Sequence, residues 1–174
     1  MKKLNPRGQR WLKSLHVLFA SVWVGAAVVL GAKQFFVNPS DGGELYGILS
    51  TMNFVDYFVI IPGAVGILLT GIVYSVWTNW GWFKHKWILV KWIICIYGIA
   101  FGTYPLGPWL DGLVDRSKEQ GLRALSDPSY VHNEHMLRIF GTFQILTLIF
   151  AIFISVLKPW EQKERTKSTK KSPG

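Results

Sequence analysis

The sequence predicts an all-α membrane protein: a four-transmembrane-helix bundle with both termini on the cytoplasmic side. Three observations lead to this fold class. Half of the 174 residues are hydrophobic. They are gathered into four long blocks instead of being spread periodically. Basic residues are concentrated in alternate segments between the blocks. Because a helix of about 20 apolar residues crosses the hydrocarbon core of a bilayer, each block is long enough for one span.

The first two blocks predict helices over 11–32 and 56–80. The first helix carries a single charged residue, Lys13, and one histidine, His16. MKK followed by an apolar run is also the pattern of a secretory signal peptide, but this run is longer than usual and contains Trp23 and His16. We therefore interpret it as a span. The second helix contains PGAVG, and its proline predicts a kink.

The last two blocks predict helices over 86–109 and 136–158. The third helix has glycines at 98 and 102, a spacing that favours close helix packing, and we expect YPLGPWL to end it. The fourth contains Gln144 and Thr147, which we expect to hydrogen-bond to other helices. Residues 1–160 then form one transmembrane domain, and 161–174 form a basic, disordered cytoplasmic tail.

The two remaining segments, about 33–55 and 111–130, are expected to be loops outside the membrane. The first contains the turn-rich stretch NPSDGGE, and the second is charged and in part helical. These loops carry more acids than bases, whereas the N-terminus, the turn at 78–86 and the tail are strongly basic. This asymmetry follows the positive-inside rule and places both termini in the cytoplasm. It also accounts for the net charge of +9 without nucleic acid as a partner.

His16 and Lys91 are ionisable residues within predicted spans, at a shared depth near the cytoplasmic side. An ionisable group there is costly unless it is paired, hydrated or neutral. His16 is interpreted either as a neutral imidazole bonded to a neighbouring helix or as an axial ligand to haem iron. Trp23 and Gly25 would suit a flat ring packed between helices. Lys91 either extends to the interface, offers a cation to a propionate or other carboxylate, or acts as a proton-carrying group. Lys86 is expected at the interface.

A polar cluster is predicted at the opposite, outer side. Asp56 and Arg138 would form a salt bridge between the second and fourth helices. His132 and His135 are three residues apart, which would suit a metal site, although two histidines supply only half of one. We favour a structural role for them. The chain has no GxSxG, HExxH or CxxC motif and no phosphate-binding glycine loop, and whether it is an enzyme stays open.

The chain resembles a family of uncharacterised bacterial four-helix integral membrane proteins over most of residues 10–160. The resemblance is carried by KSLHVLFASVWVG, by IIPGAVGILLTGIVYSVWTNWGWFKHKWILVKW, by FGTYPLGPWL and by the final helix ending in KPW. That family is distantly similar to the membrane-embedded haem-containing protoporphyrinogen oxidases and to the membrane domains of copper-resistance proteins. The resemblance implies the bacterial cytoplasmic membrane as the location.

The similarity to the oxidases implies a haem site. Lys13, His16, Trp23 and Gly25 are similar to the pattern of the oxidases' first helix. The oxidases' functional lysine matches Lys86 when counted from the start of the third helix, although Lys91 lies deeper. In the fourth helix the oxidases have asparagine-glutamate-valine-proline where this chain has GTFQ at 141–144. The resemblance therefore bears on haem binding more than on oxidase activity.

The function we predict is a membrane-embedded protein that binds haem b and takes part in electron transfer or porphyrin oxidation. His16 would be the iron ligand, and Lys91 or Lys86 would lie near a propionate. The alternative is a non-enzymatic integral membrane protein without cofactor, either an assembly partner or a small transporter subunit. The partners expected are the lipid bilayer and either a second copy of the chain or a membrane redox protein.

Overall fold

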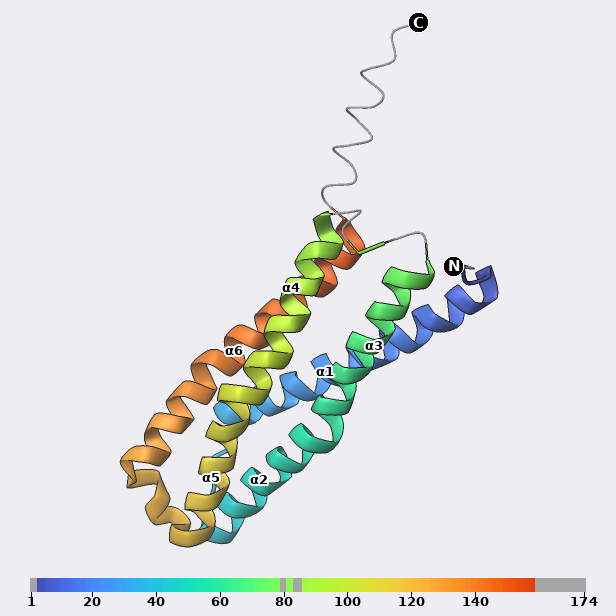
Figure 1. Cartoon of the computed structure of the whole chain (residues 1–174). Helices are drawn as coiled ribbons and strands as arrows, with labels where there is room; N and C mark the ends of the chain where they lie inside the picture. The colour runs from blue at the N-terminus through green and yellow to red at the C-terminus, as the bar shows by residue number, and fades with distance from the viewer. Residues whose placement is uncertain (1–2, 79–80, 83–85, 159–174) are drawn as a thin grey trace, which may run out of the picture.

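The computed structural model describes residues 3–78, 81–82 and 86–158, and this part of the chain is built from helices (Figure 1). Four helical stretches follow one another along the chain, and successive stretches run antiparallel. Each is long and apolar enough to cross a membrane, so the chain is a multi-pass membrane protein. We call the end of the bundle where the first stretch begins and the last one ends the terminal end.

The first stretch is α1 (Pro6–Phe36), which is longer than the predicted 11–32. The Asn5 side chain accepts a hydrogen bond from the Gly8 N–H, and Pro6 occupies the first turn, where its missing N–H costs nothing. Only Leu12 and Trp23 are buried in this helix. Val24, Ala27 and Leu30 are partly buried against the cores, whereas most of its remaining large apolar side chains are exposed, as in a helix that borders lipid.

The second stretch joins α2 (Gly42–Val55), a π-helical turn η1 (Asp56–Ile60) and α3 (Ile61–Trp77). The predicted loop over 33–55 is therefore wrong for all of α2. A proline removes one backbone donor and crowds the preceding turn. The wide turn η1 precedes Pro62, so the helix passes through this position without ending.

The third stretch joins α4 (Lys86–Phe101), the π-helical turn η2 (Gly102–Leu106), α5 (Gly107–Gln120) and the 3₁₀ turn η3 (Gly121–Ser126). Pro105 lies within η2, which accommodates it as η1 accommodates Pro62. The prediction that YPLGPWL ends this helix is wrong, because the π-helical turn η2 lets the helix continue into α5.

The fourth stretch is α6 (Pro128–Leu157), which begins earlier than the predicted 136. The Asp127 side chain caps it by accepting from the Ser129 and Tyr130 N–H groups. The predicted tail at 161–174 lies outside the described residues.

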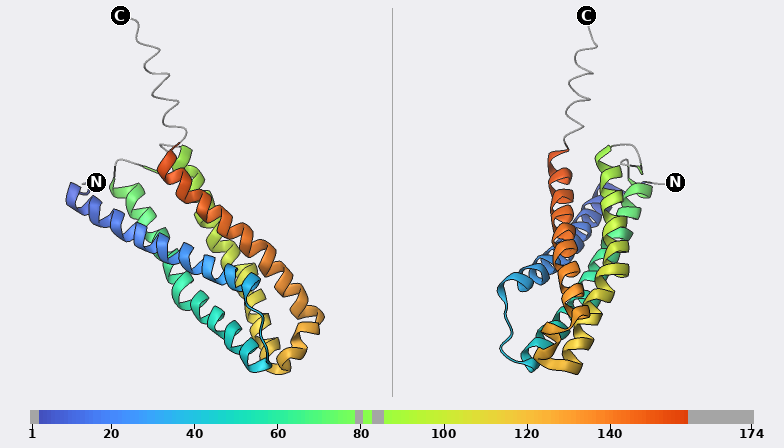
Figure 2. Two further views of the ribbon diagram at one scale, coloured as in Figure 1. Left: turned by 180° about the vertical axis from the view of Figure 1, so that it is seen from behind. Right: turned by 90° about the vertical axis from the view of Figure 1, so that its left-hand side faces the viewer.

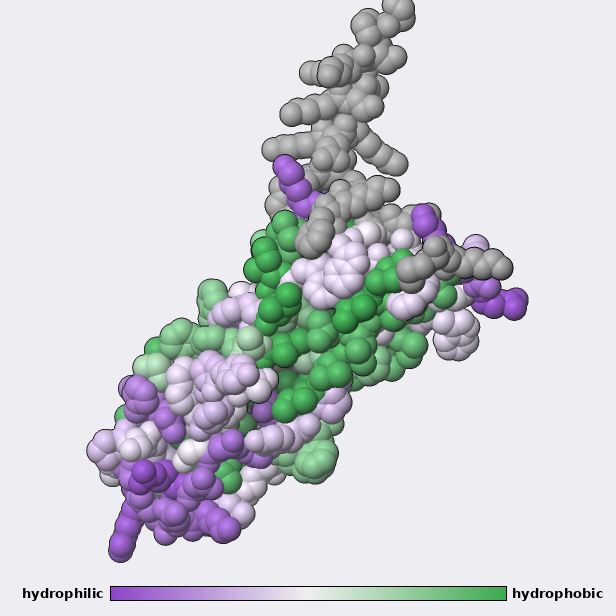
Figure 3. All heavy atoms as spheres, viewed as in Figure 1, coloured by the Kyte–Doolittle hydropathy of each residue, from purple (hydrophilic) through white to green (hydrophobic). Residues whose placement is uncertain are grey.

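The second stretch has 36 residues and the third has 41. At 1.5 Å per residue the shorter one is about 54 Å long, whereas the hydrocarbon core is about 30 Å thick. Both stretches must therefore extend beyond the bilayer. The extension is at the end opposite the terminal end, where Figure 3 shows hydrophilic residues gathered. We call α2, α5, η3 and residues 128–138 of α6 the helical cap.

The helical cap contains the most completely buried core of the described chain. Leu45, Leu49 and Leu113 are each at most 2% exposed. Further members of the same cluster are Met52, Leu110, Ala124, Tyr130 and Leu137. Apolar burial is driven by water, which surrounds the cap but not the spans. The core therefore lies where the hydrophobic effect operates.

Two glycines close the cap where α2 begins beside the end of α5. A Cβ on Gly42 would lie 2.8 Å from the Gly121 Cα, so only glycine permits this approach. Gly121 itself has φ of 56°, in the left-handed region that glycine adopts easily. Asp41 caps α2 through the Glu44 N–H, and the Glu44 carboxylate accepts from the Ser40 N–H in return.

The helices separate into two pairs toward the terminal end. There α1 stays beside α3, and the Leu4 N–H donates to the Trp77 carbonyl. Likewise α4 stays beside α6, with Trp87 and Ile88 packed in one cluster with Ile154. Figure 2 shows the two pairs diverging. The side chains that form the candidate site lie in this half of the molecule.

Candidate functional site

His16 on α1 is hydrogen-bonded to Thr70 on α3. Its Nδ1 lies 2.7 Å from the Thr70 Oγ1. The same hydroxyl lies 2.7 Å from the Gly66 carbonyl oxygen and 3.1 Å from the Ile67 carbonyl oxygen, both on its own helix. A hydroxyl that donates to these carbonyls accepts from His16, which then has its proton on Nδ1 and its free lone pair on Nε2. A hydroxyl that donates to His16 instead requires the Nε2–H tautomer.

The Nδ1–H tautomer is the arrangement expected of a metal-ligating histidine, whose second nitrogen usually donates a hydrogen bond to a protein acceptor. It is also what a neutral structural imidazole between two helices requires. The ring is half-buried, and its neighbour is Tyr74, whose ring meets it edge-on at a centroid distance of 5.6 Å. Thr70 and Tyr74 were missed by the sequence analysis. They are four residues apart on one helix face, and only the register of α3 against α1 brings them to His16.

Lys91 on α4 lies close enough to His16 to act on it electrostatically. Its Nζ is 5.5 Å from the centroid of the Trp87 ring, one helical turn nearer the terminal end. The ammonium is thus directed back along its own helix, as the predicted extension toward the interface requires. The Lys158 Nζ lies 5.3 Å from the same ring. Two cations therefore share one indole beside the candidate site.

Lys86 is not brought into this group. It begins α4 and is exposed to the surroundings. Of the two lysines considered for a propionate, only Lys91 lies near His16.

Trp23 and Gly25 do not line a common space. Trp23 is 3% exposed and packs with Ala64 and Leu148 in the middle of the bundle. A Cβ on Gly63 would lie 3.2 Å from the Trp23 backbone nitrogen, and a Cβ on Gly98 would lie 3.2 Å from its ring. The indole therefore fills the room beside Gly98, and Gly63 lets α3 approach the backbone of Trp23. Gly25 is on the exposed side of α1, where an added Cβ would have no neighbour within 4 Å.

Gln144 is confirmed as a link between helices, because its side-chain nitrogen donates to the Gly98 carbonyl at 3.1 Å. The same prediction is wrong for Thr147, whose hydroxyl donates to the Gln144 carbonyl on its own helix at 2.7 Å. The predicted salt bridge between Asp56 and Arg138 is wrong. Arg138 pairs instead with Glu134 on its own helix, at 2.9 Å. The charged group that acts electrostatically on Asp56 is Asp111. Helix spacing explains the pair that forms, since residues four apart are neighbours on one face.

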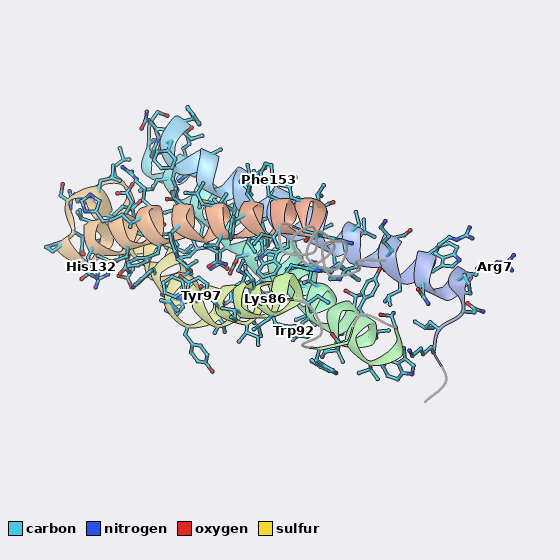
Figure 4. The ribbon with its side chains drawn as sticks, turned by 90° about the horizontal axis from the view of Figure 1, so that it is seen from above. Arg7, Lys86, Trp92, Tyr97, His132 and Phe153 are labelled. Atoms are coloured by element: carbon cyan, nitrogen blue, oxygen red, sulfur yellow. The ribbon has the colours of Figure 1, made fainter. Side chains whose placement is uncertain are left out.

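His132 and His135 are exposed on the cap portion of α6. Figure 4 shows His132 toward the opposite end of the molecule from Arg7. Within residues 3–78, 81–82 and 86–158, no three His, Cys, Asp or Glu side chains are grouped so that they could hold a metal ion. Nothing in this region joins the outer histidines to the candidate site.

Comparison of the chain with models of protein families, with curated proteins and with solved structures gives no significant match. The resemblance to the uncharacterised bacterial family and to the haem-containing oxidases stays a prediction.

Proposed function

We propose that the chain is a haem-binding membrane protein in which His16 would hold the iron. The observation that carries the proposal is the hydrogen bond between His16 Nδ1 and Thr70, because it holds the ring and, in the Nδ1–H tautomer, leaves Nε2 as the ligating nitrogen. The donor chemistry therefore fits haem b on the His16 side. Lys91 would hold a propionate by charge. A bound haem would supply a one-electron couple at its iron.

The protein's own residues would fulfil two tasks at such a site. Thr70 would keep the imidazole in one tautomer and one orientation. The half-buried position between α1 and α3 would limit the access of water to the ring. Electron transfer to a membrane redox partner is the activity this arrangement supports best.

The test is the absorption spectrum of the detergent-purified protein from haem-replete cells, before and after reduction by dithionite. A Soret band with α and β bands that sharpen on reduction is expected. His16→Ala should lose these bands, and His132→Ala, a histidine exposed on the cap, should keep them. Equal haem content in the wild type and His16→Ala would remove His16 from the iron.

A second candidate function is a cofactor-free membrane protein, for example an assembly partner. The packing of Trp23 against Gly63 and Gly98 favours it, because the indole already fills the centre of the bundle. In this case the wild type would show a featureless visible spectrum, and His16→Ala would lower only the thermal stability. The same spectrum thus distinguishes the two functions.

We further propose that both termini lie in the cytoplasm and that the cap lies outside a bacterial cytoplasmic membrane. The charge distribution supports this orientation. The acids of the described chain lie from Asp41 to Glu134, while the residues before Asp41 carry only bases.

A further inference from the structure

The helical cap contains a partly enclosed cavity of about 210 Å³ between α1, α2, α5 and α6. Its walls combine an apolar floor with charged residues. The floor includes Leu45, Leu49, Met52, Leu113 and Leu137, which belong to the cap core. The charged side is formed by Lys33, Glu134 and Arg138, together with Gln34. A cavity of this size would hold about seven waters or one small organic molecule.

Two buried polar atoms of the cavity lining make no hydrogen bond within the described residues. The Gln34 Oε1 and the Arg138 Nε have no hydrogen-bond partner in the described part of the chain. A buried donor without a partner is costly, so groups of this kind indicate a missing ligand or water. Arg138 is held in place independently, because it pairs with Glu134 and lies over the Phe35 ring at 5.7 Å.

The charges of the cavity do not cancel. The Glu134 carboxylate accepts a hydrogen bond from the Arg138 Nη2 at 2.9 Å, so these two charges offset each other. Lys33 lies within electrostatic reach of both groups and leaves one positive charge in excess. A monoanion would neutralise this excess. The Arg138 Nε–H would donate to it, and a half-turn of the Gln34 amide would offer a second donor.

We propose that this cavity binds a small monocarboxylate with a short apolar chain. The carboxylate would lie between Lys33 and Arg138, and the chain would rest on the leucines of the cap core. The site is distinct from the candidate haem site. Lys33 is 17 residues after His16 on the same helix, which corresponds to about 26 Å along its axis.

The test is equilibrium dialysis of labelled hexanoate against the full-length protein in detergent, corrected with protein-free micelles. Saturable binding by the wild type is expected. Lys33→Gln should weaken it about tenfold, since it removes a charged hydrogen-bond donor. Lys118→Gln, an exposed lysine of α5 outside the cavity lining, should leave it unchanged. Hexan-1-ol should not compete.

Equal hexanoate affinity in the wild type and Lys33→Gln, or competition by hexan-1-ol at similar concentration, would overturn the proposal. Leu125→Trp provides a second variant that leaves the charges intact. Leu125 lines the cavity and is 43% exposed, so the larger ring can be accommodated at the rim while obstructing the ligand. This variant should also weaken binding, and unchanged affinity would contradict the assignment. Dodecanoate distinguishes the source: tighter binding than hexanoate indicates a bilayer fatty acid, and weaker binding a water-soluble acid.

Discussion

A single hydroxyl determines the chemistry available to His16. When Thr70 donates to its own helix, it accepts from the imidazole, and the free lone pair of His16 is then on Nε2. The sequence identifies His16 because an ionisable residue within an apolar run is conspicuous. It cannot identify Thr70, since threonines in spans usually bond to their own backbone, as this one also does.

Thr70→Val keeps the shape of the side chain and removes the acceptor. If the haem proposal holds, haem affinity should fall about ten- to a hundredfold, as expected for loss of a partner of a ligating histidine. Thr51→Val is the control, because the Thr51 hydroxyl is exposed and donates only to Gly47 in its own helix. Haem titration of the two purified variants provides the comparison. An identical affinity in both would mean that the hydrogen bond is only structural.

Asp127 should make the start of α6 sensitive to acid. The Gln120 side chain, which donates to Asp127 at 3.0 Å, is the largest influence holding its pKa below the usual value. The N–H groups of Tyr130 and Ser129 and the guanidinium of Arg116 act in the same direction. A carboxylate with a lowered folded pKa stabilises the fold above its unfolded pKa, about 3.9, and this contribution is lost as the pH falls through the folded value.

The thermal midpoint of the wild type should therefore fall more steeply than that of Asp127→Asn below about pH 4. Above pH 5 the wild type should be the more stable of the two, since asparagine lacks the charge for Arg116. Differential scanning fluorimetry from pH 3 to 7 measures both. Parallel pH curves for the two proteins would show that the hydrogen bonds of Asp127 at the start of α6 do not depend on its ionisation.

At the scale of elements, the sequence predicts the spans well and the cap poorly. A span is recognisable because the bilayer requires about 20 apolar residues in succession. The segments α2 and α5 have no such run. They bury one face against each other. Because α5 continues the helix that begins with α4, it has neither a long apolar block nor an N-terminal boundary of its own. From the sequence alone, Pro62 predicts a kink and the YPLGPWL segment predicts the end of a helix. In both places a π-helical turn lets the helix continue.

The contact between α1 and α3 depends on Gly63. An added Cβ would meet the backbone of Trp23 at 3.2 Å, and backbone cannot move aside as a side-chain end can. Gly63→Ala should destabilise the protein by about 1–3 kcal/mol. Gly25→Ala on the exposed side of α1 is the matched control and should be neutral or slightly stabilising. Unfolding in detergent, followed by tryptophan fluorescence, tests the pair. Equal stability of the two variants would refute the close contact.

At the scale of the whole molecule, the proposed orientation predicts which residues are accessible from outside the cell. In a Cys95→Ser background, Lys118→Cys on the cap should react with a membrane-impermeant maleimide in intact cells. Arg10→Cys at the terminal end should react only after permeabilisation. Both positions are exposed, so accessibility reports the side of the membrane. The reverse pattern would invert the orientation and place the cap in the cytoplasm.

The composition of the cap core also constrains how the protein is made. Leu45 comes from the segment between the first two spans, Leu113 from the segment between the last two, and Leu137 from the start of the fourth span. A ribosome delivers these segments in order, and in the proposed orientation the earlier ones are translocated across the membrane before the last one is made. The core cannot close until the last span is inserted. In a nascent chain that stalled after residue 126, the cap-core leucines would be exposed to solvent and accessible to chaperones and proteases. Closure of the helical cap therefore requires the completed fourth span.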